Sequence, residues 1–396
     1  MFSKLRRKKF LSVLLAFTLF LCSFLGNVSS LPVFAEDVDL SCKGAVLMEA
    51  STGTVLFEKN PHKKLRPASI TKIMTLLLIF EAMEQGKFTL SDMVTTSEHA
   101  ASMGGSNVFL EANEQQTVET MIKCICIASA NDAAVAMGEY IAGTEEKFVD
   151  MMNQKAKDLS MNETHFVNAC GLDADGHVTS AYDIAVMSRE LITKYPEVLN
   201  YTGIWMDSFE HVTKRGTSTF GLANTNKLIK QYPYATGLKT GSTSLAKYSV
   251  SATASKDGLN LIAVILAAPD YKVRFTEAIT LLNYGFANVK LYEDSPTLNG
   301  KALKITKGDA LQVPLKLDDS FRYVDTSGND LSMIKAKISL PESFEAPVKK
   351  GDVVGSYDYY LNKKKIGSIA IYAAENVNKL TYSICVKKLL YRLLPL

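Results

Sequence analysis

The sequence contains little that would support metal or disulfide chemistry. Its 396 residues include only five histidines and six cysteines. The histidines show no spacing typical of metal ligands; they occupy positions 62, 99, 165, 177 and 211. Outside the N-terminal apolar stretch five cysteines remain, an odd number that does not make a disulfide framework. No cysteine lies in a nucleophile motif, and Cys124 and Cys126 are predicted to be small core residues.

The chain also lacks an excess of basic charge once its first residues are set aside. Residues 1–35 have the layout of a secretory signal, with a basic start, an apolar stretch over 11–26 and small residues before a cleavage point at Ala35. An uncleaved anchor is the alternative, although this stretch is short for a membrane span. The remainder holds 39 Lys and Arg against 41 Asp and Glu, a net charge of about −2. This excludes a strongly basic nucleic-acid surface, and we expect the rest of the chain to be exported.

No internal repeat or low-complexity tract is present, and the length allows two domains. Residues 44–58 predict a hairpin that turns at 51–53, and strands return over 236–268 with a turn at 256–258. Strands at both ends of a helical block predict one α+β domain whose antiparallel sheet joins them. The helices that we expect span 69–85, 116–142, 144–159, 181–194 and 274–286.

The composition changes near 287–300, and short alternating segments over 301–373 predict a small all-β domain that acts as a spacer or interaction module. Residues 380–394 have helical periodicity, with apolar residues on one face and Lys387, Lys388 and Arg392 off it. This segment fits a helix in the plane of the lipid headgroups, and packing on the β domain is the alternative. The expected limits are 1–35 for the signal, 36–290 for the first domain, 291–375 for the β domain and 376–396 for the amphipathic helix.

Ser69 and Lys72 could form a nucleophile and its base. Pro67 favours a helix start near Ser69, and residues three apart share a helix face, so Lys72 can reach Ser69. A serine hydroxyl attacks only when a base takes its proton, and a lysine serves as base only when its pKa is lowered. The apolar run after Lys72 would bury it, and the helix dipole would favour an oxyanion near the Ser69 N–H. Alone, this pattern also fits a helix cap with a surface lysine.

Two further stretches make the combination specific. "IASANDAA" places Ser129, Ala130 and Asn131 at a helix-to-loop boundary, and "TGLKTGST" places Lys239-Thr240-Gly241-Ser242 on a strand. Gly241 would let a substrate backbone approach the strand edge. Each stretch has a simpler reading, as a turn or a surface charge. The ordered set S-x-x-K, S-x-N, K-T-G is that of β-lactamases and penicillin-binding proteins.

The sequence resembles the low-molecular-weight penicillin-binding proteins that are serine-type D-alanyl-D-alanine carboxypeptidases. The resemblance is close over roughly 40–290, in "TGTVLFEKN", "RPASITKIMT", "GGSNVFLEANEQQTVETMI", "FVNACGLDADGHVTSAYDIA", "NTNKLI" and "GLKTGST". The β domain and terminal helix match the layout of the family. The resemblance implies a β-lactamase/transpeptidase-like α+β domain followed by the small all-β domain.

The resemblance also implies a role for each motif residue. Ser69 would be acylated, with Lys72 as its base and Ser129 as the proton relay to the leaving amine. Asn131 would bind the substrate amide, Lys239 would supply positive potential, and Thr240 would hold the terminal carboxylate. The backbone N–H groups of Ser69 and Ser242 would form the oxyanion hole. Arg274 aligns with an arginine near that carboxylate, and a surface cation at a helix start is the alternative. Ala246-Lys247 stands where the family usually has Ala-Gly, and Tyr234-Ala235 stands where a glycine is common. Both departures would bear on substrate preference.

The implied substrate is a peptidoglycan stem peptide ending in D-Ala-D-Ala, cleaved by covalent catalysis without a metal or cofactor. β-Lactams would acylate the same serine and act as covalent inhibitors. The expected location is the outer face of the cytoplasmic membrane. A β-lactamase is an alternative, but the E-x-x-x-N loop of class A enzymes is not found over 155–180. A non-catalytic β-lactam sensor is a further alternative, and the intact motifs argue against it.

Overall fold

The computed structural model describes residues 38–214, 216–317 and 320–386. The expected signal peptide, and Lys387, Lys388 and Arg392 of the expected terminal helix, lie outside these residues. Within the described part, the first domain is built on a five-stranded antiparallel sheet in the order β2-β1-β9-β8-β7. Its strands are β1 (Gly44–Glu49), β2 (Val55–Lys59), β7 (Ala235–Thr243), β8 (Lys247–Lys256) and β9 (Leu259–Ala268).

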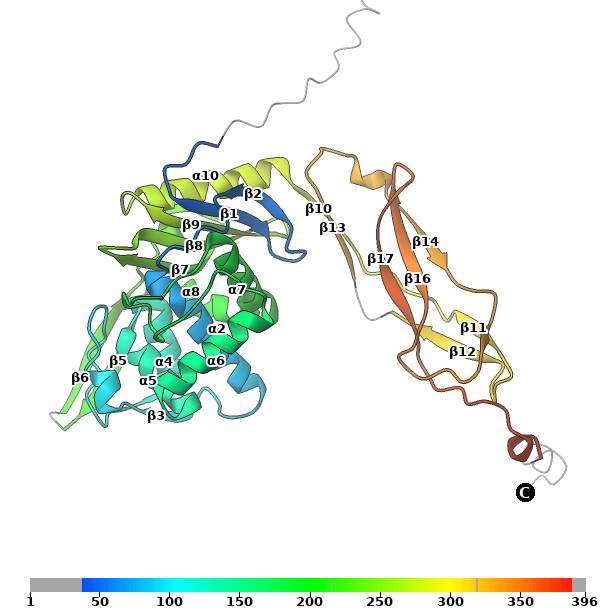
Figure 1. Cartoon of the computed structure of the whole chain (residues 1–396), viewed down its shortest axis with the longest axis horizontal. Coiled ribbons are helices and arrows are strands. Elements are labelled where there is room, and N and C mark those ends of the chain that lie inside the picture. The colour runs from blue at the N-terminus through cyan, green and yellow to red at the C-terminus, as the bar shows by residue number, and fades with distance from the viewer. Residues whose placement is uncertain (1–37, 215, 318–319, 387–396) are drawn as a thin grey trace, which may run out of the picture. The chain divides into compact units, whose positions relative to one another are not determined.

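This sheet joins the two ends of the domain, as the sequence predicts. Gly44 pairs with Leu266 and Glu49 with Leu261, so the N-terminal hairpin extends the C-terminal strands. Successive side chains of a strand point to opposite faces. Val46 and Met48 join the core formed with the helical block, whereas Leu47 faces α10 (Val273–Asn288). Figure 1 shows α10 along one face of the sheet and the helical block on the other.

The helical block surrounds α2 (Lys72–Glu84), whose first nine residues are all buried. A helix that is apolar on every side must lie inside a domain. Ser97, Thr117, Thr144 and Ser180 each cap a helix by accepting a backbone N–H. The surrounding helices are α3 (Glu98–Ala101), α4 (Val118–Lys123), α5 (Asn131–Ala142), α6 (Glu145–Asp158), α7 (Ala181–Lys194), α8 (Leu199–Thr202) and α9 (Leu228–Gln231).

Three features differ from the sequence prediction. The predicted helix over 116–142 is interrupted, because a π-helical turn over Cys124–Ala128 ends it and α5 begins at Asn131. Residues 115–117 are a strand, β4, paired with β3 (Met93–Thr95). The hairpin of β5 (Met206–Thr213) and β6 (Gly216–Ala223) was not predicted. Its strands carry polar residues and few apolar ones, so their alternation is weak.

Residues 290–379 form the all-β part of the chain. A six-stranded sheet has the order β14-β16-β17-β12-β11-β15, and β10 pairs with β13. Val313 and Ile371 are fully buried, and the rings of Phe321 and Tyr359 stack at 3.8 Å between centroids. The strands are β10 (Lys290–Asp294), β11 (Ala302–Thr306), β12 (Gln312–Lys316), β13 (Phe321–Asp325), β14 (Lys335–Ser339), β15 (Phe344–Glu345), β16 (Val353–Leu361) and β17 (Lys364–Ala373).

Residues 382–386 are helical, which agrees with the start of the predicted terminal helix. The side chains of Tyr382 and Val386 are exposed. Among the described residues, no helix has the length and apolar character needed to cross a membrane.

The contact between α10 and the sheet can be tested at Gly285. A Cβ there would lie 2.6 Å from Leu261 Cδ1 and 3.0 Å from Leu47 Cδ2. Alanine favours a helix over glycine by about 1 kcal/mol, whereas overpacking costs about 1–3 kcal/mol. We expect Gly285→Ala to lower the free energy of unfolding, measured in urea, by up to about 2 kcal/mol, because the overpacking offsets the gain in helix propensity. Ala287→Leu, at an exposed position of α10, should change it by less than about 0.5 kcal/mol. A Gly285→Ala protein more stable than the parent by about 1 kcal/mol, the full gain in helix propensity, would contradict this packing.

Candidate active site

Ser69 lies on a short 3-10 turn, Ala68–Thr71, that leads directly into α2. Pro67 precedes the turn, and Ala68 has a left-handed φ of 48°. Ser69 is partly exposed, whereas Lys72 is completely buried. The Lys72 Nζ lies 3.2 Å from the Ser69 Oγ. The structure therefore confirms that Lys72 reaches Ser69, and it excludes the alternative of a surface lysine.

The Lys72 amine has two other close partners, both neutral. It donates to Asn131 Oδ1 at 2.6 Å and to the carbonyl of Cys170 at 2.7 Å. Burial lowers the pKa of Lys72 to about 8, against smaller opposing effects of Cys170 and Asp132. A neutral amine keeps two N–H donors and one lone pair. With the donors on Asn131 and Cys170, the lone pair can accept the Ser69 proton.

Ser129 occupies the break between the π-helical turn and α5. Its backbone is left-handed, with φ 62° and ψ 34°, and its side chain is buried. Asn131 begins α5, so the predicted boundary is a two-residue break between helices. Left-handed non-glycine residues and π-helical turns are both concentrated at functional sites. The break turns the two polar side chains toward lysines on different elements.

Lys239 brings the third motif to the same place. On β7, its Nζ donates to Ser129 Oγ at 2.8 Å and to the Thr240 carbonyl at 3.1 Å. Burial, followed by the positive charge of Lys72, holds the pKa of Lys239 well below its usual value. The site thus contains two buried lysines, each bonded to a serine hydroxyl. The described residues form no cluster that could hold a metal ion.

Asn131 is held from both sides. Its Nδ2 donates to the Gly104 carbonyl at 2.6 Å, and its backbone N–H donates to the Ser106 carbonyl at 2.7 Å. The loop over 102–108 therefore fixes the asparagine whose Oδ1 accepts from Lys72. Neither of the two hydrogen bonds involves a charged partner.

The remaining candidates lie on or behind β7. The Thr240 hydroxyl donates to Thr225 Oγ1 at 2.8 Å, and Ser242 is exposed. Packing also requires a glycine at position 241, which the sequence did not reveal. A Cβ there would lie 2.7 Å from the Pro67 carbonyl oxygen. Arg274 is only 8% exposed, so the surface-cation alternative is wrong. Its Nη1 donates to the carbonyls of Gly241 at 3.2 Å and Ser249 at 3.3 Å, and burial lowers its pKa to about 10.

Sequence analysis missed the segment 168–172, which closes the site over Lys72. Asn168 Oδ1 accepts the backbone N–H groups of Gly171 at 2.6 Å and Leu172 at 3.2 Å, which folds the segment into a tight loop. Gly171 has φ 91°, and a Cβ there would lie 1.9 Å from the Ala68 carbonyl oxygen. An asparagine followed three residues later by glycine is a turn signal that could have marked this loop.

The geometry matches a known family. The model of D-alanyl-D-alanine carboxypeptidases matches residues 32–270, which contain the three motifs. The chain belongs to the D-alanyl-D-alanine carboxypeptidase family. The model of the C-terminal domain of penicillin-binding protein 5 matches residues 286–379. The protein is thus a serine-type D-Ala-D-Ala carboxypeptidase and a low-molecular-weight penicillin-binding protein.

Relatives of this carboxypeptidase align along most of its length. The D-alanyl-D-alanine carboxypeptidase DacF of Bacillus subtilis is 41% identical over 87% of this chain and 88% of its own. DacC of Escherichia coli is 34% identical over 87% and 86% of the two chains. Penicillin-binding protein 5 of Haemophilus influenzae superposes with a TM-score of 0.73 at 30% identity, covering 86% of this chain and 98% of that one.

The contact of Gly171 with the serine turn gives a prediction for the carboxypeptidase. An L-residue at positive φ costs about 1–2 kcal/mol, and overpacking adds about 1–3 kcal/mol. We expect Gly171→Ala to lower the free energy of unfolding by about 2–5 kcal/mol and to slow labelling by fluorescent penicillin.

Gly176→Ala is the matched control. Gly176 also has a positive φ, 82°, but a Cβ there would meet nothing closer than His165 Nδ1 at 4.0 Å. It should cost only about 1–2 kcal/mol and leave penicillin labelling unchanged. Equal effects of the two substitutions in urea unfolding and labelling would show that the contact with Ala68 is unimportant.

Proposed function

We propose that this enzyme removes the terminal D-alanine of peptidoglycan stem peptides through an acyl-enzyme on Ser69. The observation that carries the proposal is the contact between Ser69 Oγ and a completely buried Lys72 amine. Burial lowers the pKa of that amine to about 8, so roughly a tenth of it is neutral at pH 7, far more than for an ordinary lysine. A neutral amine beside a partly exposed hydroxyl is the arrangement that an activated nucleophile needs.

The reaction then has two covalent steps. Ser69 Oγ attacks the penultimate carbonyl while its proton passes to Lys72, and the oxyanion lies between the backbone N–H groups of Ser69 and Ser242. The C–N bond breaks when Ser129 gives its proton to the amine of the leaving D-alanine, and the proton that Lys72 took from Ser69 replaces the one that Ser129 lost. The Lys239 ammonium beside Ser129 favours this transfer toward the substrate. Water then attacks the acyl-enzyme, which releases the shortened peptide and regenerates Ser69.

The strand residues would hold the substrate. Asn131 would bind the amide of the peptide, and Gly241 would bring the strand backbone close to it. Thr240 and Lys239 present a hydroxyl and positive potential to the terminal carboxylate. Arg274 bonds to the carbonyls of Gly241 and Ser249, so its charge lies directly behind the strand edge. We propose that it contributes through this potential and through the placement of the strand.

The direct test combines penicillin labelling with D-alanine release. We expect fluorescent penicillin to form a stable adduct, and the diacetylated Lys-D-Ala-D-Ala tripeptide to release D-alanine. Both signals should be lost in Ser69→Ala, because no other hydroxyl contacts Lys72 among the described residues. An adduct that disappears within seconds, without D-alanine release, would indicate a β-lactamase instead. A stable adduct without D-alanine release would indicate a sensor.

The pKa of Lys72 predicts the pH dependence of acylation. The active form is the neutral amine, so the rate should rise with pH and reach half its maximum near pH 8. From pH 6 to pH 8 the neutral fraction increases roughly 50-fold. Stopped-flow measurement of penicillin acylation between pH 5.5 and 9.5 checks this, with Lys72→Ala as the inactive control. A rate that is constant over this range would contradict the role of Lys72 as base.

We also propose that the protein is exported and acts at the outer face of the cytoplasmic membrane, with its final helix at the lipid surface. The basic residues near its end would attract anionic lipid. The full chain without residues 1–35 should sediment with vesicles that contain phosphatidylglycerol and less with phosphatidylcholine vesicles. A chain that ends at residue 379 should remain in the supernatant. Equal sedimentation of both chains would place any membrane contact elsewhere.

A further inference from the structure

Glu145 lies outside the catalytic motifs, yet it contacts the loop that closes over Lys72. It is the first residue of α6, and its side chain is only 16% exposed. Its Oε1 accepts the backbone N–H of Ala169 at 2.9 Å. A carboxylate that loses this much water must be paired or hydrogen-bonded. The Oε1 atom of Glu145 therefore bonds to the backbone N–H of Ala169.

That peptide group adjoins the contacts that define the site. The Ala169 carbonyl accepts from the Thr75 hydroxyl on α2 at 2.6 Å. The next carbonyl, that of Cys170, accepts from Lys72 Nζ. Gly171 then packs against the Ala68–Ser69 peptide. A shift of the Ala169 peptide would thus be transmitted to both the base and the nucleophile turn.

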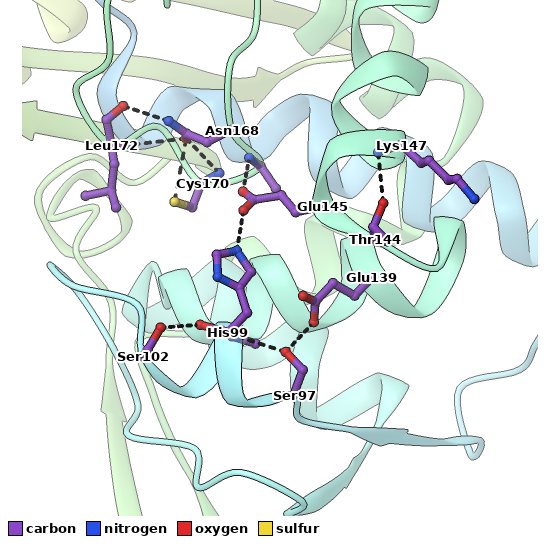
Figure 2. A network of polar contacts seen from close by, with 12 residues as sticks. Ser97, His99, Ser102, Glu139, Thr144, Glu145, Lys147, Asn168, Cys170 and Leu172 are labelled. Atoms are coloured by element: carbon purple, nitrogen blue, oxygen red, sulfur yellow. Dashed lines mark hydrogen bonds and ion pairs between the residues drawn. The ribbon is translucent and has the colours of Figure 1, made fainter.

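His99 holds the other oxygen of Glu145. Its Nε2 lies 2.7 Å from Glu145 Oε2, and its ring is 54% exposed. Figure 2 shows Glu145 between His99 and the segment that carries Asn168 and Cys170. His99 belongs to α3, which is anchored by its cap Ser97 through a 2.6 Å bond to Glu139 on α5. The carboxylate therefore has a fixed partner on each side.

The same pair links two loops that meet over the site. The chain runs from α3 into the loop 102–108, which holds Asn131 through Gly104 and Ser106. A Cβ on Gly105 would lie 2.8 Å from Asn131 Nδ2 and 3.4 Å from Leu172 Cδ2. Gly105, in the loop that holds Asn131, thus lies close to Leu172, in the segment that holds Lys72. The bond between His99 and Glu145 joins α3, which precedes the loop 102–108, to α6, which contacts the segment 168–172.

We propose that Glu145, held by His99, is a positioning residue that keeps the Cys170 carbonyl on Lys72 and thereby sets the rate of Ser69 acylation. The inference rests on the proposed roles of Ser69 and Lys72. An ordinary acidic residue at a helix start would interact only with the helix dipole. Glu146, exposed in the same turn, meets that description and provides the comparison.

The test measures penicillin acylation by stopped flow in Glu145→Ala, Glu145→Gln and Glu146→Ala. It separates the dissociation constant of the initial complex from the first-order acylation constant. We expect Glu145→Ala to lower the acylation constant about 10- to 100-fold with an unchanged dissociation constant, because displacement of a reacting group by about 1 Å can cost 100-fold. Glu145→Gln should recover most of the rate, because its Oε1 can still accept from Ala169. Glu146→Ala should match the parent.

His99→Ala provides a second route that disturbs the fold little, because the ring is half exposed. It should lower the acylation constant several-fold with an unchanged melting temperature, and it decides the question if Glu145→Ala fails to fold. Acylation at the parent rate in Glu145→Ala or His99→Ala would overturn the inference and leave the proposed function standing. Glu145→Gln as slow as Glu145→Ala would also overturn it. A parent protein that is not acylated at Ser69 would overturn both proposals.

Discussion

The burial of the Lys72 amine is the constraint on which the rest of the site depends. An ammonium group inside a domain is costly, so burial lowers the pKa of Lys72 to about 8. Neutral hydrogen-bond acceptors surround the amine. Those acceptors, Asn131 Oδ1 and the Cys170 carbonyl, come from two different parts of the chain. A carboxylate in their place would favour the charged ammonium and leave no neutral amine for the proposed role as base. The helical block therefore has to deliver amide and carbonyl oxygens to one point.

Close backbone approach makes that delivery possible. Gly241 and Gly171 both touch the turn that carries Ser69, one from the β7 strand and one from the loop 168–172. Ala68 and Ser129 hold left-handed backbones that cost free energy, and the surrounding core sustains them. The turn is thus packed between a sheet edge and a loop. Ser69 therefore stays partly exposed to solvent, whereas Lys72, at the start of α2, is completely buried.

The second lysine adds to the same electrostatic arrangement. After burial, the positive charges of Lys72 and Arg274 lower the pKa of Lys239, and Arg274 lies behind the strand. A site with this potential favours a substrate that ends in a carboxylate. Positive charge also lowers the pKa of a neighbouring amine. The proposed binding and the proposed activation therefore depend on the same buried basic residues.

The sequence alone determined the three motifs, the α+β order of elements and the all-β segments, because these follow from local periodicity and residue spacing. It also placed Lys72 one turn from Ser69, since three residues of helix set that distance. Only the tertiary structure decided what surrounds them. The π-helical turn before Ser129 and the β5–β6 hairpin depend on contacts that local patterns do not encode. The same holds for the Cys170 carbonyl, Gly171 and the Glu145–His99 pair, because backbone groups and partners distant in sequence meet only when the core packs.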